Sequence, residues 1–344
     1  MTDKDLKPET DWRALTIYQI MVSSFEHSPE GAEGYDSMWG PSGERKDGNL
    51  QATGYFANDY FSIDSHFGTE DDLRELVAKA HERGLYVFLD GVFGHHGGVD
   101  KPSPSGYTVD STPTLSARGD AGGISSRIFR DGGLKSAFDF DGKLLIGGEM
   151  NGEDGGGLEH GWDDVMKVYS SPADRGYQPA DVLPNLFLSN HDGVRVADSF
   201  YDNGDEVNLM TRFAILAGYP GPVTIYYGDE FADLSRDCAD AQPDNASRTT
   251  GHLKPDDDRE RRLFNYVCDA MTFRHDNPAM WRGTMQFDRY KKDDAEILVV
   301  VKTDTETDNR VAMIFSDRDT DVALPGDTET RRVRGYVPEL IKLA

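Results

Sequence analysis

Several apolar segments of this 344-residue sequence end in a carboxylate, which is a side chain able to perform acid–base chemistry. The acidic residues that close these segments are Asp90, Glu149, Asp192 and Asp229. When two carboxylates flank a glycosidic bond, one can protonate the leaving oxygen while the other attacks the anomeric carbon or activates water. Because many other enzymes also use acidic pairs, this pattern alone indicates a carboxylate-rich site and not one particular reaction.

The elements expected around these carboxylates follow the order of an α/β protein. Strands are predicted for residues 16–22, 85–90, 143–149, 186–192 and 222–230. A helix is predicted over 70–81, with Thr69 as its N-cap and a glycine after its end, and another over 206–216. Alternating helices and apolar strands favour a parallel sheet, and in a (β/α) barrel the carboxyl ends of the strands carry the active site.

The end of the chain changes character, because its predicted strands have no helices between them. These strands cover 295–301, 311–315 and 336–341. The sequence therefore predicts a barrel domain over 1–284 and a small antiparallel β domain over 285–344. Residues 97–123 are rich in glycine, serine and proline; by the family resemblance given below, they stand where an inserted domain is short or absent.

Charge excludes some classes of partner. The chain has 62 acidic and 36 basic residues and a formal net charge of −26. Such a surface repels nucleic acid and anionic lipid, so we expect neither as a partner. The acidic clusters are typical of a solvated surface, and a salt-adapted source is the alternative. Two cysteines form neither a disulfide framework nor a metal motif, and no secretory signal is evident, so a cytoplasmic location is expected.

The local motifs make the chemistry specific. Residues 89–95, 148–149, 187–192 and 225–230 resemble, in this order, four signature segments of the α-amylase family, glycoside hydrolase family 13. Further segments similar to that family are 18–20, 54–60, 67–69 and 335–340. The resemblance implies a (β/α)8 TIM-type barrel followed by a C-terminal antiparallel β domain. It also implies hydrolysis of α-glucosidic bonds in α-linked oligosaccharides or polysaccharides by a retaining mechanism.

The resemblance assigns roles to individual residues. Glu149 matches the family's general acid/base, which must hold a proton at the working pH. Asp192 matches the carboxylate that stabilises the transition state. The positions that match substrate-binding residues are Tyr55, Asp90, His95 and His191. Among these, Tyr55 resembles the aromatic side chain that stacks on the sugar.

The segment that carries the family's nucleophile is not found between Asp90 and Glu149. That segment has the form Gly-x-Arg-x-Asp, and the nearest string is 126–132, in which Arg130 directly precedes Asp131. Asp131 is therefore a candidate nucleophile, although a solvent loop is the favoured interpretation. Asp139 and Asp90 are the alternatives for this role.

Other family features are also missing. Gly94 stands where much of the family has an asparagine that helps to bind calcium, so we expect no cofactor and no calcium. Fewer strands can be placed than the eight of a closed barrel, which predicts an incomplete one. Three hypotheses remain open: an active glycoside hydrolase, a catalytically impaired member that binds sugar or acts as a scaffold, and a shortened or rearranged form of an active parent.

Overall fold

The computed structural model describes residues 11–22, 25, 61–63, 67–90, 136–148, 157–177, 182–203, 206–235, 247–249, 251–324 and 330–343. The α-helices in these ranges are α2 (Glu70–Glu82), α4 (Phe140–Gly147), α5 (Trp162–Val168), α6 (Glu206–Ala217), α7 (Asp258–Asp276) and α8 (Ala279–Arg282), and the 3-10 helices are η1 (Trp12–Ala14), η2 (Val196–Asn203) and η3 (Asp229–Phe231). The strands are β1 (Thr16–Gln19), β2 (Leu186–Phe187), β3 (Val223–Tyr226), β4 (Thr284–Lys292), β5 (Ala295–Asp304), β6 (Asn309–Ser316), β7 (Thr320–Ala323), β8 (Thr330–Val333) and β9 (Glu339–Lys342).

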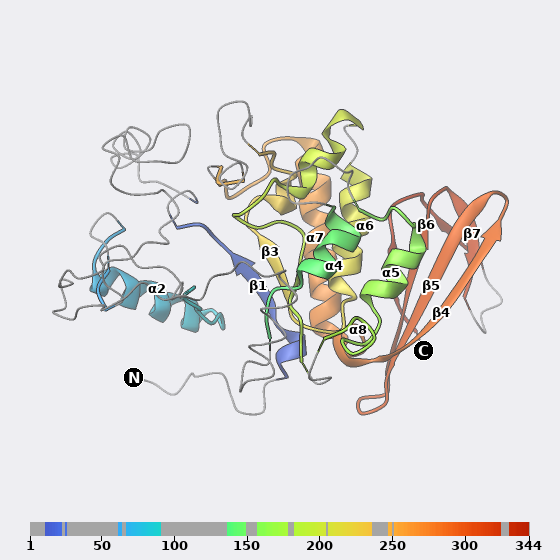
Figure 1. Ribbon diagram of the computed structural model, residues 1–344, viewed down its shortest axis with the longest axis horizontal. Helices are drawn as coiled ribbons and strands as arrows, with labels where there is room; N and C mark the ends of the chain where they lie inside the picture. Colours follow the sequence, from blue (N-terminus) through green and yellow to red (C-terminus); the bar gives the residue numbers. More distant parts are fainter. Residues whose placement is uncertain are drawn as a thin grey trace.

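A parallel sheet joins the start of the chain to its middle. Its strand order is β1-β3-β2, and Val223 pairs with Thr16 on one side and with Leu186 on the other. An isolated parallel bridge from Phe138 to Asn185 extends this arrangement beyond β2. The first strand, β1, therefore lies beside β3, which is the last strand of this sheet in the sequence (Figure 1). The closure of a (β/α) barrel requires this pairing of first and last strands.

The C-terminal strands form antiparallel sheets. One has the order β4-β5-β6-β9, and β7 pairs with β8 in the other. The predicted strands 295–301 and 311–315 are confirmed as parts of β5 and β6. The predicted strand 336–341 begins later, at Glu339, because Tyr336 has a φ of +58° and Pro338 follows it. The division into domains at residues 284 and 285 stays a prediction.

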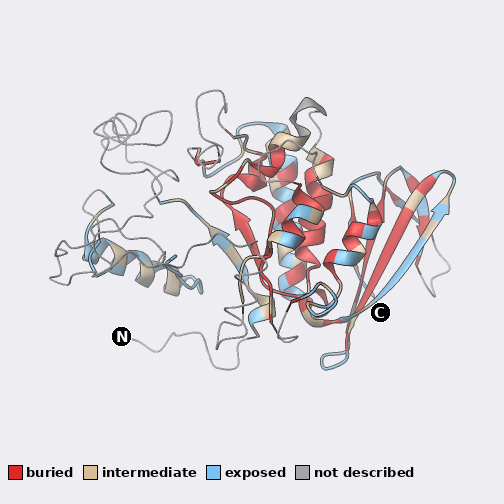
Figure 2. Cartoon of the chain, viewed as in Figure 1, coloured by how far each residue is buried: buried red, intermediate tan, exposed pale blue. Residues whose placement is uncertain are grey.

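Strand β5 is buried on both faces, which explains its uninterrupted apolar sequence. Leu298 and Val300 pack in a core with α5, α6 and α7, whereas Ile297 and Val299 pack on the opposite face with residues of β7 and β8. Figure 2 shows the C-terminal sheet with a buried strand of this kind. Successive side chains of a strand point to opposite faces, so each face receives alternate residues. The C-terminal sheet thus shares its inner core with the helices beside the parallel sheet.

The C-terminal end of α6 is fixed by two buried side chains from other elements. Arg274 on α7 donates to the carbonyl oxygens of Ala217, Tyr219 and Gly221, and also to that of Arg13. Lys302 on β5 donates to the Gly218 carbonyl at 2.6 Å. The last carbonyls of a helix have no partners within the helix, so these donors satisfy groups that would otherwise be buried without hydrogen bonds.

Helix α2 confirms the helix predicted over 70–81. The Thr69 hydroxyl accepts from the Asp72 N–H at 3.2 Å, and the Asp72 carboxylate accepts from the Thr69 N–H at 2.7 Å, which completes a capping box. None of the helix residues is buried. The helix predicted over 206–216 is confirmed as α6.

The strand predicted over 143–149 is wrong, because residues 140–147 form α4. The Asp139 carboxylate accepts from the Gly142 N–H at 2.8 Å and caps the start of this helix. Short apolar runs fit a buried helix as well as a strand, and here the aspartate before the run decides for the helix by capping it. Gly148 is the C-cap residue of α4, and Glu149, the next residue in the sequence, lies outside the described residues.

The buried strand predicted over 85–90 is also wrong. These residues form no strand with any other described residue, and the Leu89 side chain is 74% exposed. An apolar run becomes a buried strand only where neighbouring strands supply hydrogen bonds and cover its faces. The predicted insertion, residues 97–123, lies outside the described residues.

Within the described residues, no helix combines the length and the apolar character that crossing a bilayer requires.

Replacing Arg274 with Met is expected to lower the free energy of unfolding by about 3–5 kcal/mol, because several buried carbonyls lose their donor. Urea unfolding followed by circular dichroism measures this change. The matched control is Arg261→Met on the same helix, where the side chain is 55% exposed and the expected change is within about 0.5 kcal/mol. Equal stability losses in the two variants would contradict the role given to Arg274.

Candidate functional site

Polar residues gather at the carboxyl ends of the parallel strands. Asn190, His191 and Asp192 follow β2, and the Gly228–Glu230 segment follows β3. Because the strands run in the same direction, these segments lie at the same edge of the sheet. This edge is where enzymes with parallel barrels place their active sites.

His191, Asp192 and Arg248 form the centre of this edge. His191 Nε2 lies 3.3 Å from Asp192 Oδ1, and the Arg248 guanidinium lies 3.6 Å from the same oxygen. Arg248 also donates from Nε to the His191 carbonyl oxygen at 3.0 Å. The Asp192 side chain is 37% exposed, whereas those of His191 and Arg248 are 11% and 5% exposed. A solvent-accessible carboxylate is thus held by a buried imidazole and a buried guanidinium.

His191 is suited to hydrogen bonding with hydroxyl groups. Burial lowers its pKa, and the Asp192 and Asp90 carboxylates partly oppose that decrease. A neutral imidazole offers one donor and one acceptor, a combination that matches a sugar hydroxyl.

A second carboxylate at this edge, Asp229, is completely enclosed. Its Oδ1 lies 3.3 Å from the Arg195 guanidinium, and both side chains are at most 1% exposed. Burial raises the pKa of Asp229 to about 7, and Arg195 opposes that increase. Arg195 also donates to the Tyr227 carbonyl at 2.6 Å and to Thr249 Oγ1 at 3.0 Å. This pair connects the end of β3 to the segment that carries Arg248.

Glu230 is held by β1. The Tyr18 hydroxyl donates to Glu230 Oε1 at 2.6 Å, and the Gly228 N–H donates to Oε2 at 3.0 Å. Burial raises the pKa of Glu230 and that of Tyr18. These hydrogen bonds fix the turn after β3 against the first strand.

Asp139, an alternative for the nucleophile, has a structural role. Its carboxylate is fully buried and forms a bidentate ion pair with Arg175. It also accepts hydrogen bonds from the hydroxyls of Tyr177 and Tyr219, each at 2.8 Å. A carboxylate that is occupied by five donors and closed to solvent cannot attack a sugar.

The structure brings two of the predicted site residues, His191 and Asp192, into contact, and the Asp90 carboxylate contributes to raising the pKa of His191. The other predicted site residues, Glu149, Asp131, Tyr55 and His95, lie outside the described residues, so their roles stay predictions. Two arginines of the site were not predicted. Arg195 lies three residues after Asp192, so its closeness in sequence could have indicated it. Arg248 lies 56 residues after Asp192, and nothing in the sequence connects the two.

Residues able to hold a metal ion occur away from Asp192. His252, Asp256 and Glu260 are grouped near the start of α7. Gly94, the position that bears on the calcium prediction, lies outside the described residues.

Comparison with known proteins gives local sequence matches. Residues 43–103 match the family described as "Alpha amylase, catalytic domain". An α-amylase of Streptomyces lividans is 42% identical over 53 residues, which cover 15% of this chain and 6% of the relative. Alpha-amylase 3 of Schizosaccharomyces pombe is 37% identical over 116 residues, which cover 24% of this chain and 21% of the relative. The chain therefore matches less than a quarter of the length of either relative.

Solved structures match the fold over nearly the whole chain. AmyP, crystallised in complex with maltose, aligns with a TM-score of 0.71 at 22% identity and covers 96% of each chain. The α-amylase of Geobacillus thermoleovorans, complexed with acarbose, aligns with a TM-score of 0.61 at 18% identity and covers 98% of this chain and 99% of that one. The local sequence matches confirm the resemblance to the α-amylase family, and the solved structures confirm the barrel fold with a C-terminal antiparallel sheet.

The enclosed Asp229 makes a pH-dependent contribution to stability. Because its pKa is 3.8 ordinarily and about 7 in the fold, the folded state binds more protons between these values, and the contribution decreases as pH rises through this window. The free energy of unfolding of the wild type minus that of Asp229→Asn should therefore fall between about pH 4 and about pH 7. Urea titrations across this pH range measure the difference, and the exposed Asp288→Asn serves as the control. A difference between wild type and Asp229→Asn that does not change with pH would refute the prediction.

Proposed function

We propose that this chain, an α-amylase-family protein by local sequence matches and by fold, acts on α-glucosidic bonds of maltooligosaccharides or α-glucans. The observation that carries the proposal is the His191–Asp192–Arg248 group at the carboxyl edge of the parallel sheet. It combines an accessible carboxylate with a hydrogen-bonding imidazole. Supporting it, one of the solved structures with a similar fold is a protein crystallised with maltose.

The proposed chemistry is a retaining hydrolysis. Glu149 is the proposed acid/base, and it protonates the glycosidic oxygen as the bond breaks. Asp192 stabilises the positive charge that develops on the sugar ring, while His191 binds sugar hydroxyls. Asp131 is the proposed nucleophile, because Asp139 is committed to Arg175. Tyr55, Asp90 and His95 complete the proposed substrate site.

One observation favours a second candidate function, in which the chain binds α-glucans without cleaving them. Residues 140–147, which precede Glu149 in the sequence, form the helix α4 and not a strand of the parallel sheet, whereas the acid/base of such an enzyme is expected after a strand. The resemblance of Gly148-Glu149 to a signature segment then reflects two residues of local similarity. In this case the Asp192 group retains its sugar contacts, but the protonation step lacks its acid.

Turnover separates the two candidates. Hydrolysis of maltooligosaccharides, measured as released reducing ends, should fall by about 10²–10⁴-fold in Glu149→Gln. The matched control is Glu159→Gln, an exposed glutamate in the same part of the sequence, which should keep the wild-type rate. Equal rates in the wild type and Glu149→Gln would reject Glu149 as the acid, and no turnover by the wild type would favour the binding function.

Binding tests the Asp192 group whether or not turnover occurs. Isothermal titration with maltotriose should show a dissociation constant about 3–10-fold higher in His191→Gln, because one hydrogen bond to a sugar hydroxyl is lost. His160→Gln is the matched control, since His160 also lies beside an aspartate but its side chain is 74% exposed. Unchanged affinity in His191→Gln would exclude His191 from the sugar site.

A further inference from the structure

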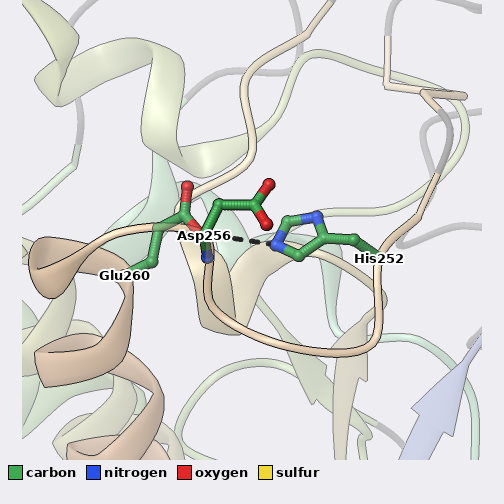
Figure 3. Close-up of side chains that lie close together, drawn as sticks. All are labelled: His252, Asp256 and Glu260. Carbon is green, nitrogen blue, oxygen red and sulfur yellow. Dashed lines mark hydrogen bonds and ion pairs between the residues drawn. The ribbon is translucent and has the colours of Figure 1, made fainter.

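Three side chains able to bind a metal meet at the start of α7. They are His252 and Asp256 from the loop before the helix and Glu260 from its first turn (Figure 3). One ligand atom from each residue lies within 4.8 Å of the other two. The group stands beyond the turn that follows β3, and neither Asp192 nor Glu149 belongs to it.

The imidazole of His252 has a buried nitrogen that faces this group. Within the described part of the chain, no group forms a hydrogen bond with its Nε2, which lies 3.6 Å from Glu260 Oε2. Buried polar atoms are nearly always hydrogen-bonded, so this nitrogen is available to a partner such as water or a metal ion. The Phe231 ring lies against the imidazole, with centroids 4.2 Å apart, and limits its rotation.

The other nitrogen of His252 faces a carboxylate that can orient the ring. Nδ1 lies 3.5 Å from Asp233 Oδ1, and Asp233 Oδ2 is itself buried without a hydrogen-bond partner among the described residues. Histidines that bind metals usually donate their second N–H to such a carboxylate, which fixes the tautomer and leaves the first nitrogen for the metal. Asp233 beside Nδ1 and Glu260 beside Nε2 therefore have the positions that metal binding by His252 requires.

The carboxylates have the capacity to bind an ion. Glu260 Oε2 accepts from the Asp256 N–H at 2.6 Å, which holds the Glu260 side chain but occupies only part of its acceptor capacity. Asp256 is exposed, so its side chain can move toward an ion. Two ligands of a tetrahedral zinc ion are about 3.3–3.4 Å apart, which is close to the separation of His252 Nε2 and Glu260 Oε2.

We propose that His252, Asp256 and Glu260 bind a divalent transition-metal ion of the zinc type, with Asp233 orienting the histidine. One nitrogen and two carboxylate ligands suit zinc, and water can take the fourth position. Calcium is a poor match, because it prefers six to eight oxygen ligands. The ion would join α7 to the loop that begins four residues after Arg248, and this role is independent of the proposed hydrolase activity.

Zinc binding is the direct test. The 344-residue chain is treated with EDTA, dialysed and titrated with Zn²⁺ alone, at a salt concentration that screens the acidic surface. We expect one tightly bound ion per chain and a higher melting temperature in its presence. His252→Gln and Glu260→Gln should each weaken binding at least 10-fold, and Asp233→Asn by about 10–100-fold. Circular dichroism checks that every variant is folded.

His275→Gln is the matched control, because His275 lies 3.0 Å from Asp276 on the same helix but is exposed. It should bind zinc as the wild type does. The proposal is overturned if the wild type binds no stoichiometric zinc, or if His252→Gln binds as tightly as the wild type. Binding that depends on Glu260 but not on His252 would indicate a carboxylate-only site and would overturn it equally.

Discussion

The carbonyl groups at the C-terminal end of α6 impose the constraint on which the rest of the described structure depends. Ten of the twelve residues of α6 are buried, so water cannot satisfy the carbonyls where the helix ends. Arg274 and Lys302 supply the donors, and they come from α7 and β5. Arg274 and Lys302 are long enough to reach the carbonyls of residues 217–221 from neighbouring elements, which explains why polar side chains occupy these buried positions.

This arrangement couples the C-terminal sheet to the candidate site. Residues 218–221 lead directly into β3, so Arg274 and Lys302 fix where that strand begins. Strand β3 in turn pairs with β1 and β2, and its end carries Asp229 and Glu230. Arg195 then connects Asp229 to Thr249, next to Arg248. The Arg248 guanidinium beside Asp192 is therefore connected, through β3 and Arg195, to the contacts that the C-terminal sheet makes with the end of α6.

The sequence predicted those parts of the fold in which local signals and burial agree. Thr69 and Asp72 form the capping box of α2 with residues three apart, and α6 and β5 have apolar patterns long enough to be unambiguous. The prediction for 143–149 failed because its three consecutive large apolar residues, 144–146, are too few to determine a period, and the decisive residue, Asp139, lies outside the segment. The run at 85–90 failed because burial depends on other segments and is not a property of the run itself.

The candidate site was predictable in type but not in detail, and the carboxylates show why. An aspartate that follows an apolar strand is the same sequence signal whether its partners enclose it or leave it accessible. Asp229 is enclosed by Arg195, and Asp139 precedes a helix and is enclosed by Arg175 and two tyrosines. The Asp192 carboxylate contacts His191 and Arg248, but its side chain stays partly exposed to solvent. Since Arg175, Arg195 and Arg248 come from separate segments, only the folded arrangement distinguishes a carboxylate that supports the structure from one that can meet a substrate.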